Sequence, residues 1–260
     1  MNPSKCRIGS IPVRLVLVVL SMVFLNHCAW LVAPPADDQA ARQLMNSLAA
    51  RNAGLEQVKG LLNLRLEAKG RVLTGRAGWA AAVPDRLRIE WLNMMGQPVA
   101  SLAGDGQTLT IHNYHENTIH HLRQSRSVLD QLIHLPIGIE DLVAVLVGRP
   151  LMPAYVAAQE KPLNEDERTI VLKNRWHMPL TRFWFNGAGE LLRQEVYEPD
   201  GALRYRLKWL AWNKSGAYTV PKKVLVETDS GDTLTLSMER FLPNAQFQPE
   251  TFVIKGQGDG

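Results

Sequence analysis

Apolar and polar residues alternate singly along much of this chain, and this pattern limits the folds that it can adopt. The clearest runs are 62–69, 86–91, 203–209 and 233–239. A period of two places one face of a strand in a core and the other in water, which is typical of antiparallel sheets. Turn signals such as Asn186-Gly187 and Pro199-Asp200-Gly201 separate such runs. The chain therefore predicts a meander in which sequence neighbours pair.

Two segments depart from this alternation and favour helices. In residues 38–53 leucines recur at near-helical spacing, and Asp37 or Asp38 is a suitable N-cap. Residues 127–147 predict a pair of short helices that are separated at Pro136. We expect the first helix and the helix pair to cover the sheet.

The predicted fold class is mainly β, in the α+β sense, with about ten or eleven strands in one sheet. A single antiparallel sheet of this size curls strongly unless it flattens or splits. A curled sheet has a concave apolar face, which the helices can cover. Residues 151–167 contain proline and then acidic residues, and we expect a loop across the fold there.

The start of the chain has the pattern of an export signal. Three basic residues, Lys5, Arg7 and Arg14, precede an apolar run over residues 15–25. That run is too short to span a bilayer alone, and the basic residues before it favour export of the chain on its C-terminal side. We therefore expect a signal peptide over residues 1–27.

Cys28 lies just after the apolar run and resembles the acylation site of a bacterial lipoprotein. We expect a lipid anchor at Cys28, with residues 28–37 as a lipidated linker. Because Ala29 and not aspartate comes next, the same resemblance favours the periplasmic face of the outer membrane. Asn26 and His27 replace the small residues that usually precede such a cysteine.

Two alternatives for the leader therefore stay open. In the first, an uncleaved segment extends through residues 30–33 and anchors the protein in the inner membrane. In the second, cleavage near Ala33 or Ala36 releases a soluble periplasmic protein.

Charge and motif content exclude several classes of function. The formal net charge is +4, and residues 1–27 supply three of these positive charges and no negative one, so the rest carries +1. Without a basic block, nucleic acid is not an expected partner. Cys6 and Cys28 both lie in or next to the leader, and no nucleophile elbow, phosphate loop or dinucleotide fingerprint is present. We expect no enzymatic activity and no cofactor.

Histidine offers the one candidate for metal chemistry. His112, His115, His120 and His121 lie within ten residues, and several imidazoles could bind zinc. However, the segment reads as a hairpin that turns near 115–118. His120 and His121 then point to opposite faces of a strand and cannot share one tetrahedral site. Solvated polar positions on an edge hairpin explain the cluster better, so we expect no metal site.

Large apolar side chains form the candidate ligand cavity. The expected lining is Trp79, Ile89, Trp91, Leu142, Leu146, Trp184, Leu207 and Trp209. Ordinary core packing is the alternative for all of them. Met94 and Met95 lie between two predicted strands, just before Gly96, where a loop normally presents polar residues to water. Two flexible apolar side chains there predict a membrane-contact loop, unless both fold back into the core.

Several segments, in order, resemble the outer-membrane lipoprotein receptor LolB and the wider LolA/LolB-like lipoprotein family. They are LEAKGRV (66–72), RLRIEWLNMMGQPVASLAGDG (86–106), LPIGIEDLVAVLVGRP (135–150), RQEVYEPDGALRYRLKW (193–209) and KKVLVETDSGDTLTLSMERF (222–241). The resemblance implies a half-barrel of eleven strands over residues 38–254, followed by a flexible tail at 255–260. No segment is diagnostic alone, and the segment 244–254 is closer to other members of the group than to LolB.

The resemblance also implies a function. Members of the family hold acyl chains in an apolar cavity, and LolB-like proteins accept lipoproteins from a periplasmic, LolA-like carrier and insert them into the outer membrane. An apolar residue on a protruding loop assists insertion, and the matching position is Met95, where the family typically has leucine. The alternative is a structural or interaction lipoprotein of the envelope that has no ligand.

Overall fold

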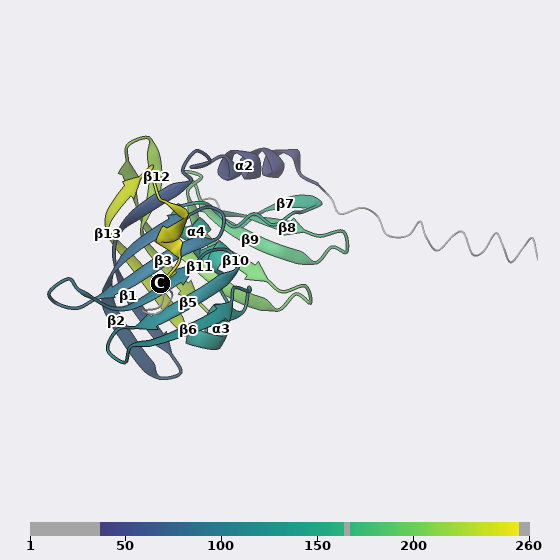
Figure 1. The fold of residues 1–260 in the computed structure, drawn as a ribbon. Helices are drawn as coiled ribbons and strands as arrows, with labels where there is room; N and C mark the ends of the chain where they lie inside the picture. The colour runs from purple at the N-terminus through teal and green to yellow at the C-terminus, as the bar shows by residue number, and fades with distance from the viewer. Residues whose placement is uncertain (1–36, 164–166, 255–260) are drawn as a thin grey trace, which may run out of the picture. The chain divides into compact units, whose positions relative to one another are not determined.

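The computed structural model of the protein describes residues 37–163 and 167–254, which form one large antiparallel sheet and a few short helices (Figure 1). The strands are β1 (Gln57–Ala68), β2 (Arg71–Ala82), β3 (Arg86–Leu92), β4 (Pro98–Gly104), β5 (Thr108–Asn113), β6 (Thr118–Arg123), β7 (Ala157–Pro162), β8 (Glu167–Lys173), β9 (Pro179–Asn186), β10 (Leu191–Tyr197), β11 (Leu203–Ser215), β12 (Tyr218–Glu227) and β13 (Thr233–Pro243). The helices are α2 (Gln39–Ala49), α3 (Val128–Ile133), α4 (Ile139–Leu146) and the 3-10 turn η2 (Pro249–Phe252). The predicted leader, Cys28 and the tail at 255–260 lie outside the described residues.

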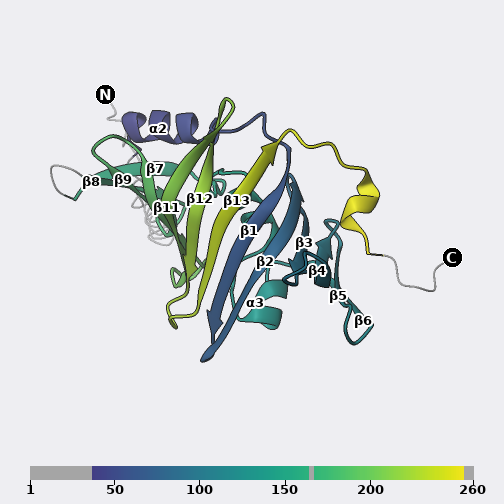
Figure 2. The ribbon, with the colours of Figure 1, turned by 90° about the vertical axis from the view of Figure 1, so that its left-hand side faces the viewer.

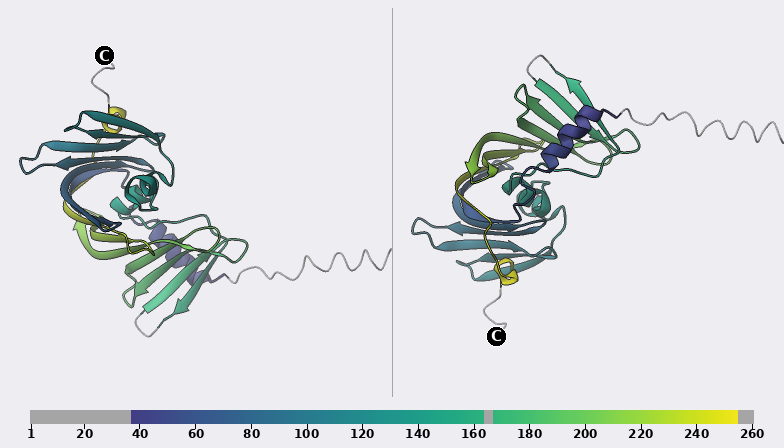
Figure 3. Two further views of the ribbon diagram at one scale, coloured as in Figure 1. Left: turned by 90° about the horizontal axis from the view of Figure 1, so that it is seen from below. Right: turned by 90° about the horizontal axis from the view of Figure 1, so that it is seen from above.

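The strand order explains how the helices come to lie on the sheet. It runs β6-β5-β4-β3-β2-β1-β13-β12-β11-β10-β9-β8-β7, so two meanders meet where β1 pairs with β13. The strands at the two edges, β6 and β7, are consecutive in sequence. The connection between them, residues 124–156, therefore has to cross the sheet, and it carries α3 and α4 over the concave face (Figure 3).

The sheet curves and stays unclosed. Figure 3 shows the central strands bending around α3 and α4. Register shifts accompany this bending, for example between Leu61 and Leu62 in β1 and between Trp91 and Leu92, and such bulges increase local twist and bend. The predicted fold class, a mainly β protein with one strongly curved antiparallel sheet, is confirmed.

The predicted strand count was too low, because the described residues form thirteen strands. One missed strand is β7, which lies inside the predicted loop 151–167. Its sequence AAQEKP has no alternation and ends in Pro162, a residue that sheets accept at an edge. The start of α2 covers this edge: the backbone N–H of Asp38 donates to Ala158 O (2.8 Å), and the backbone N–H of Ala158 donates to an Asp37 carboxylate oxygen (3.1 Å).

Helix α2 is shorter than the predicted 38–53. Asp38 caps it and accepts hydrogen bonds from Ala40 N (2.9 Å) and Ala41 N (3.3 Å), as expected for the second of the two candidate caps. The chain leaves the helix after Ala49 and reaches a left-handed conformation at Asn52, with φ of 55°. Helix α2 packs against β7 and so lies on the sheet as expected, but none of its residues lines the cavity described below.

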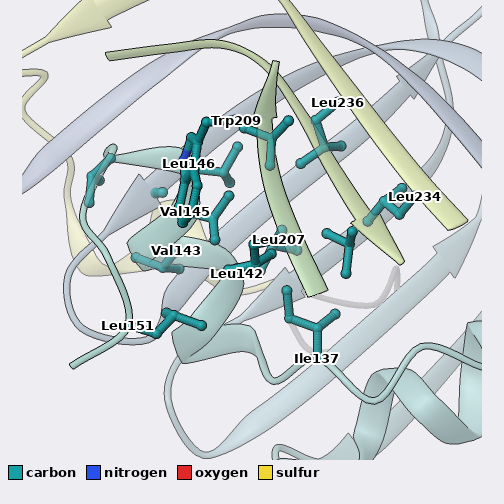
Figure 4. Close-up of a cluster of buried hydrophobic side chains, with 14 of the residues drawn as sticks. Ile137, Leu142, Val143, Val145, Leu146, Leu151, Leu207, Trp209, Leu234 and Leu236 are labelled. Atoms are coloured by element: carbon teal, nitrogen blue, oxygen red, sulfur yellow. The ribbon is translucent and has the colours of Figure 1, made fainter. Parts of the chain in front are cut away.

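Helix α4 lies in the centre of the core, and hydrogen bonds hold it near both of its ends. Its residues Ile139, Leu142, Val143, Val145 and Leu146 are buried against leucines of β11 and β13 (Figure 4). At its start, Tyr205 Oη donates a hydrogen bond of 2.7 Å to Asp141. Burial, followed by the neighbouring Asp141 carboxylate, raises the pKa of Tyr205 well above its usual value.

After its C-terminal end, α4 is held by polar contacts with the segment that follows α2. Arg149 donates to the backbone oxygens of Asn52 (3.2 Å), Ala53 (2.8 Å) and Leu55 (2.9 Å). In return, Asn52 Nδ2 donates to Val147 O at 2.9 Å. These bonds add donors to the carbonyls of this segment, and they hold the end of α4 at a fixed depth against residues 52–55.

Candidate functional site

A cavity of about 250 Å³ lies between the concave face of the sheet and the helices α3 and α4. Strands β1 to β5 and β13 form its floor. The lining residues are Leu62, Leu64, Leu66, Leu73, Leu87, Ile89, Trp91, Ala100, Ser101, Leu102, Ile111, Leu129, Leu132, Ile133, Ile139, Leu142, Leu146, Leu234 and Leu236. None of these side chains carries a charge. Such a wall suits a hydrocarbon and offers no group for acid–base or nucleophilic chemistry.

The one polar lining residue, Ser101, does not direct its hydroxyl into the cavity. On β4, Ala100 and Leu102 pair with the inward residues Trp91 and Ile89, so Ser101 between them points to the convex face. There its hydroxyl forms a hydrogen bond of 3.0 Å with Tyr114. Apart from the buried indole N–H of Trp91, which has no hydrogen-bond partner among the described residues, the side chains that line the cavity are therefore apolar.

Trp91 forms the end of the cavity next to the β3–β4 loop, and a glycine makes room for it. A side chain on Gly75 would lie 2.7 Å from the indole of Trp91, so only glycine allows the ring to rest on β2. Leu73 follows on the same face of β2 and is 48% exposed. The cavity thus reaches the surface near the turn between β1 and β2.

Four of the eight side chains predicted to line a cavity do so: Ile89, Trp91, Leu142 and Leu146. The alternating pattern also marked most of the floor, including Leu62, Leu64 and Leu87, although these were not named as site residues. The available signal was their place in the alternation, which directs their side chains to the apolar face of the sheet. The residues that α3 contributes, such as Leu132, could have been found from their helical spacing.

The other four predicted residues lie elsewhere. Trp79 packs on Phe241, with 5.7 Å between ring centroids, and Trp209 stacks on Trp212 at 5.9 Å. Leu207 is fully buried beside α4 (Figure 4). These three side chains pack in the core on the concave face, outside the cavity. For them, the alternative of ordinary core packing is correct.

Trp184 lies on the opposite face of the sheet, so its assignment to a cavity was wrong. Its neighbours Phe183 and Phe185 belong to the core, and parity therefore turns Trp184 outward. The guanidinium of Arg193 lies 3.7 Å from the centre of its ring. Three aromatic residues in a row conceal the alternation, but the polar residue two positions earlier, Arg182, marks the wet face.

Met94 and Met95 do not fold back into the core. Their side chains are fully exposed and 84% exposed, respectively, on the loop between β3 and β4. The loop itself is ordered by Asn93, whose side-chain oxygen accepts hydrogen bonds from the backbone N–H groups of Met95 and Gln97, both at 2.9 Å. The loop thus holds two adjacent apolar side chains in solvent, and exposed apolar surface of this kind can mark a contact site.

The four histidines lie on the predicted hairpin, now β5 and β6. His121 forms a hydrogen bond of 3.0 Å with Thr110 through Nδ1, and the ring of His112 packs at a tilt of 44° on that of Tyr114, with 4.1 Å between ring centroids. Throughout residues 37–163 and 167–254, no three His, Cys, Asp or Glu side chains are grouped closely enough to hold a metal ion. Within the same described residues, no helix combines the length and the apolar character that crossing a bilayer requires.

One unclosed, curved antiparallel sheet with short helices on its concave face defines a LolA-like fold. The chain is similar to a domain provisionally named for outer membrane lipoprotein sorting from Vibrio parahaemolyticus, with TM-score 0.56, 10% identity, and 82% and 96% of the two chains covered. It is also similar to a LolA superfamily protein from Nitrosomonas europaea, with TM-score 0.52, 12% identity, and coverage of 82% and 97%.

A DUF1329 family protein from Desulfovibrio piger has the same fold, with TM-score 0.56, 12% identity, and coverage of 84% and 98%. No family model and no curated protein sequence matches the chain. The comparisons therefore show the fold, and they do not single out LolB within the group.

Proposed function

We propose that this protein is an envelope lipoprotein that binds acyl chains in the apolar cavity and accepts and inserts lipoproteins, or lipid, at the outer membrane. The cavity is the observation that carries this proposal, because its lining has no charged side chain. Exposing a long acyl chain to water costs on the order of 10 kcal/mol, at about 0.8 kcal/mol for each CH₂ group. A protein that shelters the chain lowers this cost without any reactive group.

The size of the cavity suggests how it is filled. Its 250 Å³ is slightly below the roughly 300–1,000 Å³ of most small-molecule sites. The cavity thus accommodates part of one acyl chain, and a larger load requires one of its walls to move. Helix α4 is tied at both ends and buries five of its eight residues, whereas α3 buries only two of its six, Val128 and Leu129. We infer that α3 is the wall that yields.

Transfer at a membrane follows from the remaining features. In this proposal Cys28 carries the lipid anchor, which places the domain on the periplasmic face of the outer membrane. The loop with Met94 and Met95 contacts the bilayer, and a LolA-like periplasmic carrier delivers the cargo, as in LolB-like proteins. If residues 1–27 are not cleaved, the same domain is anchored in the inner membrane instead. The fold neighbour named for lipoprotein sorting supports this reading.

Identification of the bound molecule tests the cavity. The full chain is purified from envelopes without added lipid, and native mass spectrometry and solvent extraction are applied to it. We expect an acyl-containing ligand on the wild type and less of it on Ala100→Leu, a substitution in the cavity wall. A wild type that carries no acyl ligand at any loading would leave only a structural or interaction lipoprotein.

The membrane loop has a separate test. Replacing Met94 and Met95 by glutamate places two charges on side chains that are already exposed, so folding should not change. We expect delivery of lipoproteins to the outer membrane to fail, while acyl binding persists. The matched control is Leu210→Glu, because Leu210 is a 52% exposed apolar residue on β11, outside this loop. Normal lipoprotein sorting in the double variant would refute the role of the loop.

A further inference from the structure

The hairpin of β1 and β2 carries exposed apolar side chains on both of its faces. Val72 is 57% exposed and Leu73 is 48% exposed. As neighbours on a strand they point to opposite faces. Leu73 faces the cavity, but the core gives no reason for an apolar residue at Val72, which is paired with Glu67 on the polar face of β1.

This hairpin projects beyond its neighbour. Residues 71–75 of β2 pair with β1 alone, because the pairing with β3 begins at Arg76. At about 3.3 Å per residue, this stretch of β2, which has no partner on the β3 side, is about 16 Å long. Figure 2 shows the β1–β2 hairpin reaching lower than the strands beside it (Figure 2). The β3–β4 loop with the methionines follows the adjacent end of β3, so both turns lie at the same end of their strands.

The turn of the hairpin is basic. Lys69 and Arg71 flank Gly70, and neither side chain forms an ion pair with any residue in the described part of the chain. Two acidic residues lie near this turn: Glu67 on β1, which forms an ion pair with Arg65, and Asp232 in the β12–β13 turn. The carboxylate of Asp232 is already occupied by hydrogen bonds from the backbone N–H of Lys69 (2.9 Å) and from Ser230 (2.9 Å).

We propose that residues 69–73, the hairpin tip, are a second membrane-contact element, which inserts into bilayers that contain anionic lipid. This inference rests on the proposed function and extends it. A bilayer fits better than a protein partner, because the tip exposes one apolar side chain on each face, Val72 and Leu73, and a bilayer surrounds both on insertion, whereas a docked protein covers one face. The two cations then meet anionic headgroups.

The tip also links the bilayer to the cavity. Leu73 lines the cavity and is half exposed, and its partner across the hairpin, Leu66, lines the cavity as well. An inserted tip therefore gives a continuous apolar path from the acyl region of the bilayer to the cavity. Cargo would leave along β2, and the charged headgroup region would be bypassed.

A site-specific probe tests this contact in the full chain. Cys6 and Cys28 are replaced by serine, which removes both native thiols, and one cysteine with a nitroxide label is introduced by Val72→Cys. The matched control is Leu210→Cys, at a position of similar exposure (52%). The label is exposed to a water-soluble nickel complex and to oxygen, with vesicles of phosphatidylethanolamine and phosphatidylglycerol or of phosphatidylcholine alone.

We expect the label at position 72 to lose contact with the nickel complex and to gain contact with oxygen in the anionic vesicles, while the label at position 210 does not change. The double variant Lys69→Glu, Arg71→Glu should lower the affinity of the tip for anionic vesicles by about fivefold for each cation removed. In vesicles of phosphatidylcholine alone, the substitutions should not change the accessibility of the label. The leader can tether every variant to the vesicles, but only insertion of the tip protects position 72.

Equal accessibility at positions 72 and 210 in anionic vesicles would overturn the proposal. A charge reversal that leaves the protection of position 72 unchanged would overturn its electrostatic part. The acyl-binding cavity and the membrane-inserting tip can be refuted independently of each other. A protected position 72 in a protein without acyl ligand would refute the cavity alone, and a loaded cavity with an unprotected position 72 would refute the hairpin tip alone.

Discussion

Replacing Ala100 by leucine tests whether the cavity is empty space that side chains can fill. Ala100 lies in the cavity wall on β4, opposite Trp91. Leucine adds three carbon atoms, and their burial at about 0.8 kcal/mol each is worth about 2.4 kcal/mol. Restriction of the new side chain costs about 0.5–1 kcal/mol. The free energy of unfolding should therefore rise by about 1.5 kcal/mol.

The matched control is Ala81→Leu. Ala81 is fully buried in the same core but does not line the cavity, so leucine must displace packed neighbours and should lower the stability by about 1–3 kcal/mol. The assay is thermal unfolding of the delipidated full chain, followed by tryptophan fluorescence. At about 2–4 °C per kcal/mol, we expect Tm to rise by about 3–6 °C for Ala100→Leu and to fall for the control.

The same variant should also weaken the binding of a fluorescent fatty acid, since leucine occupies the space that the acyl chain would take. The two effects have opposite signs and one cause, which makes the test strict. If Ala100→Leu lowers Tm as much as Ala81→Leu does, the wall is already packed and the reasoning from an empty cavity fails.

Three further outcomes concern the supports of the cavity. Tyr205→Phe leaves Asp141 without its donor and should cost about 1.5–3 kcal/mol in urea unfolding; no loss would show that α4 is held by packing alone. Burial raises the pKa of Tyr197 to about 12 and raises the pKa of Tyr205 well above its usual value. As the pH rises, the two tyrosines therefore lose their protons in the unfolded chain before they do so in the folded one. The free energy of unfolding should be unchanged below a pH of about 10 and fall as the pH rises towards 12. In Tyr205→Phe this fall should be less steep. Gly75→Val should displace Trp91 and shift the fluorescence spectrum, whereas an unchanged spectrum would contradict the 2.7 Å contact.

The direction of side chains could be read from the sequence, and most of the cavity floor follows from it. Leu62, Leu64 and Leu66 alternate with polar residues, and the structure places all three in the cavity wall. The reason is geometric: with a period of two, the polar neighbours decide which face is dry. Where that rule was set aside in favour of residue size, at Trp184, the assignment failed.

Elements without alternation could not be predicted in this way. Strand β7 has the sequence AAQEKP and owes its place to β8 on one side and to Asp37 and Asp38 on the other. Asp37 and Asp38 lie more than a hundred residues before β7, and β8 lies beyond a turn. No local pattern in the sequence of β7 therefore reveals these partners. The length of α2 was misjudged for a similar reason, since the tertiary contacts of Asn52 with Val147 and Thr219 stabilise the turn that ends it.

The volume of the cavity is a property of the same long-range contacts. Even if every lining residue were assigned correctly from the sequence, the cavity would be absent if α4 lay closer to the sheet by the depth of one side chain. Its depth is fixed by polar contacts at both ends, Tyr205 with Asp141 at the start and Arg149 with the backbone of residues 52–55 at the end. Because a helix that moved inward would break these bonds and bury their groups unpaired, collapse is opposed by more than packing. An apolar void can therefore persist in a core whose side chains are otherwise free to fill it.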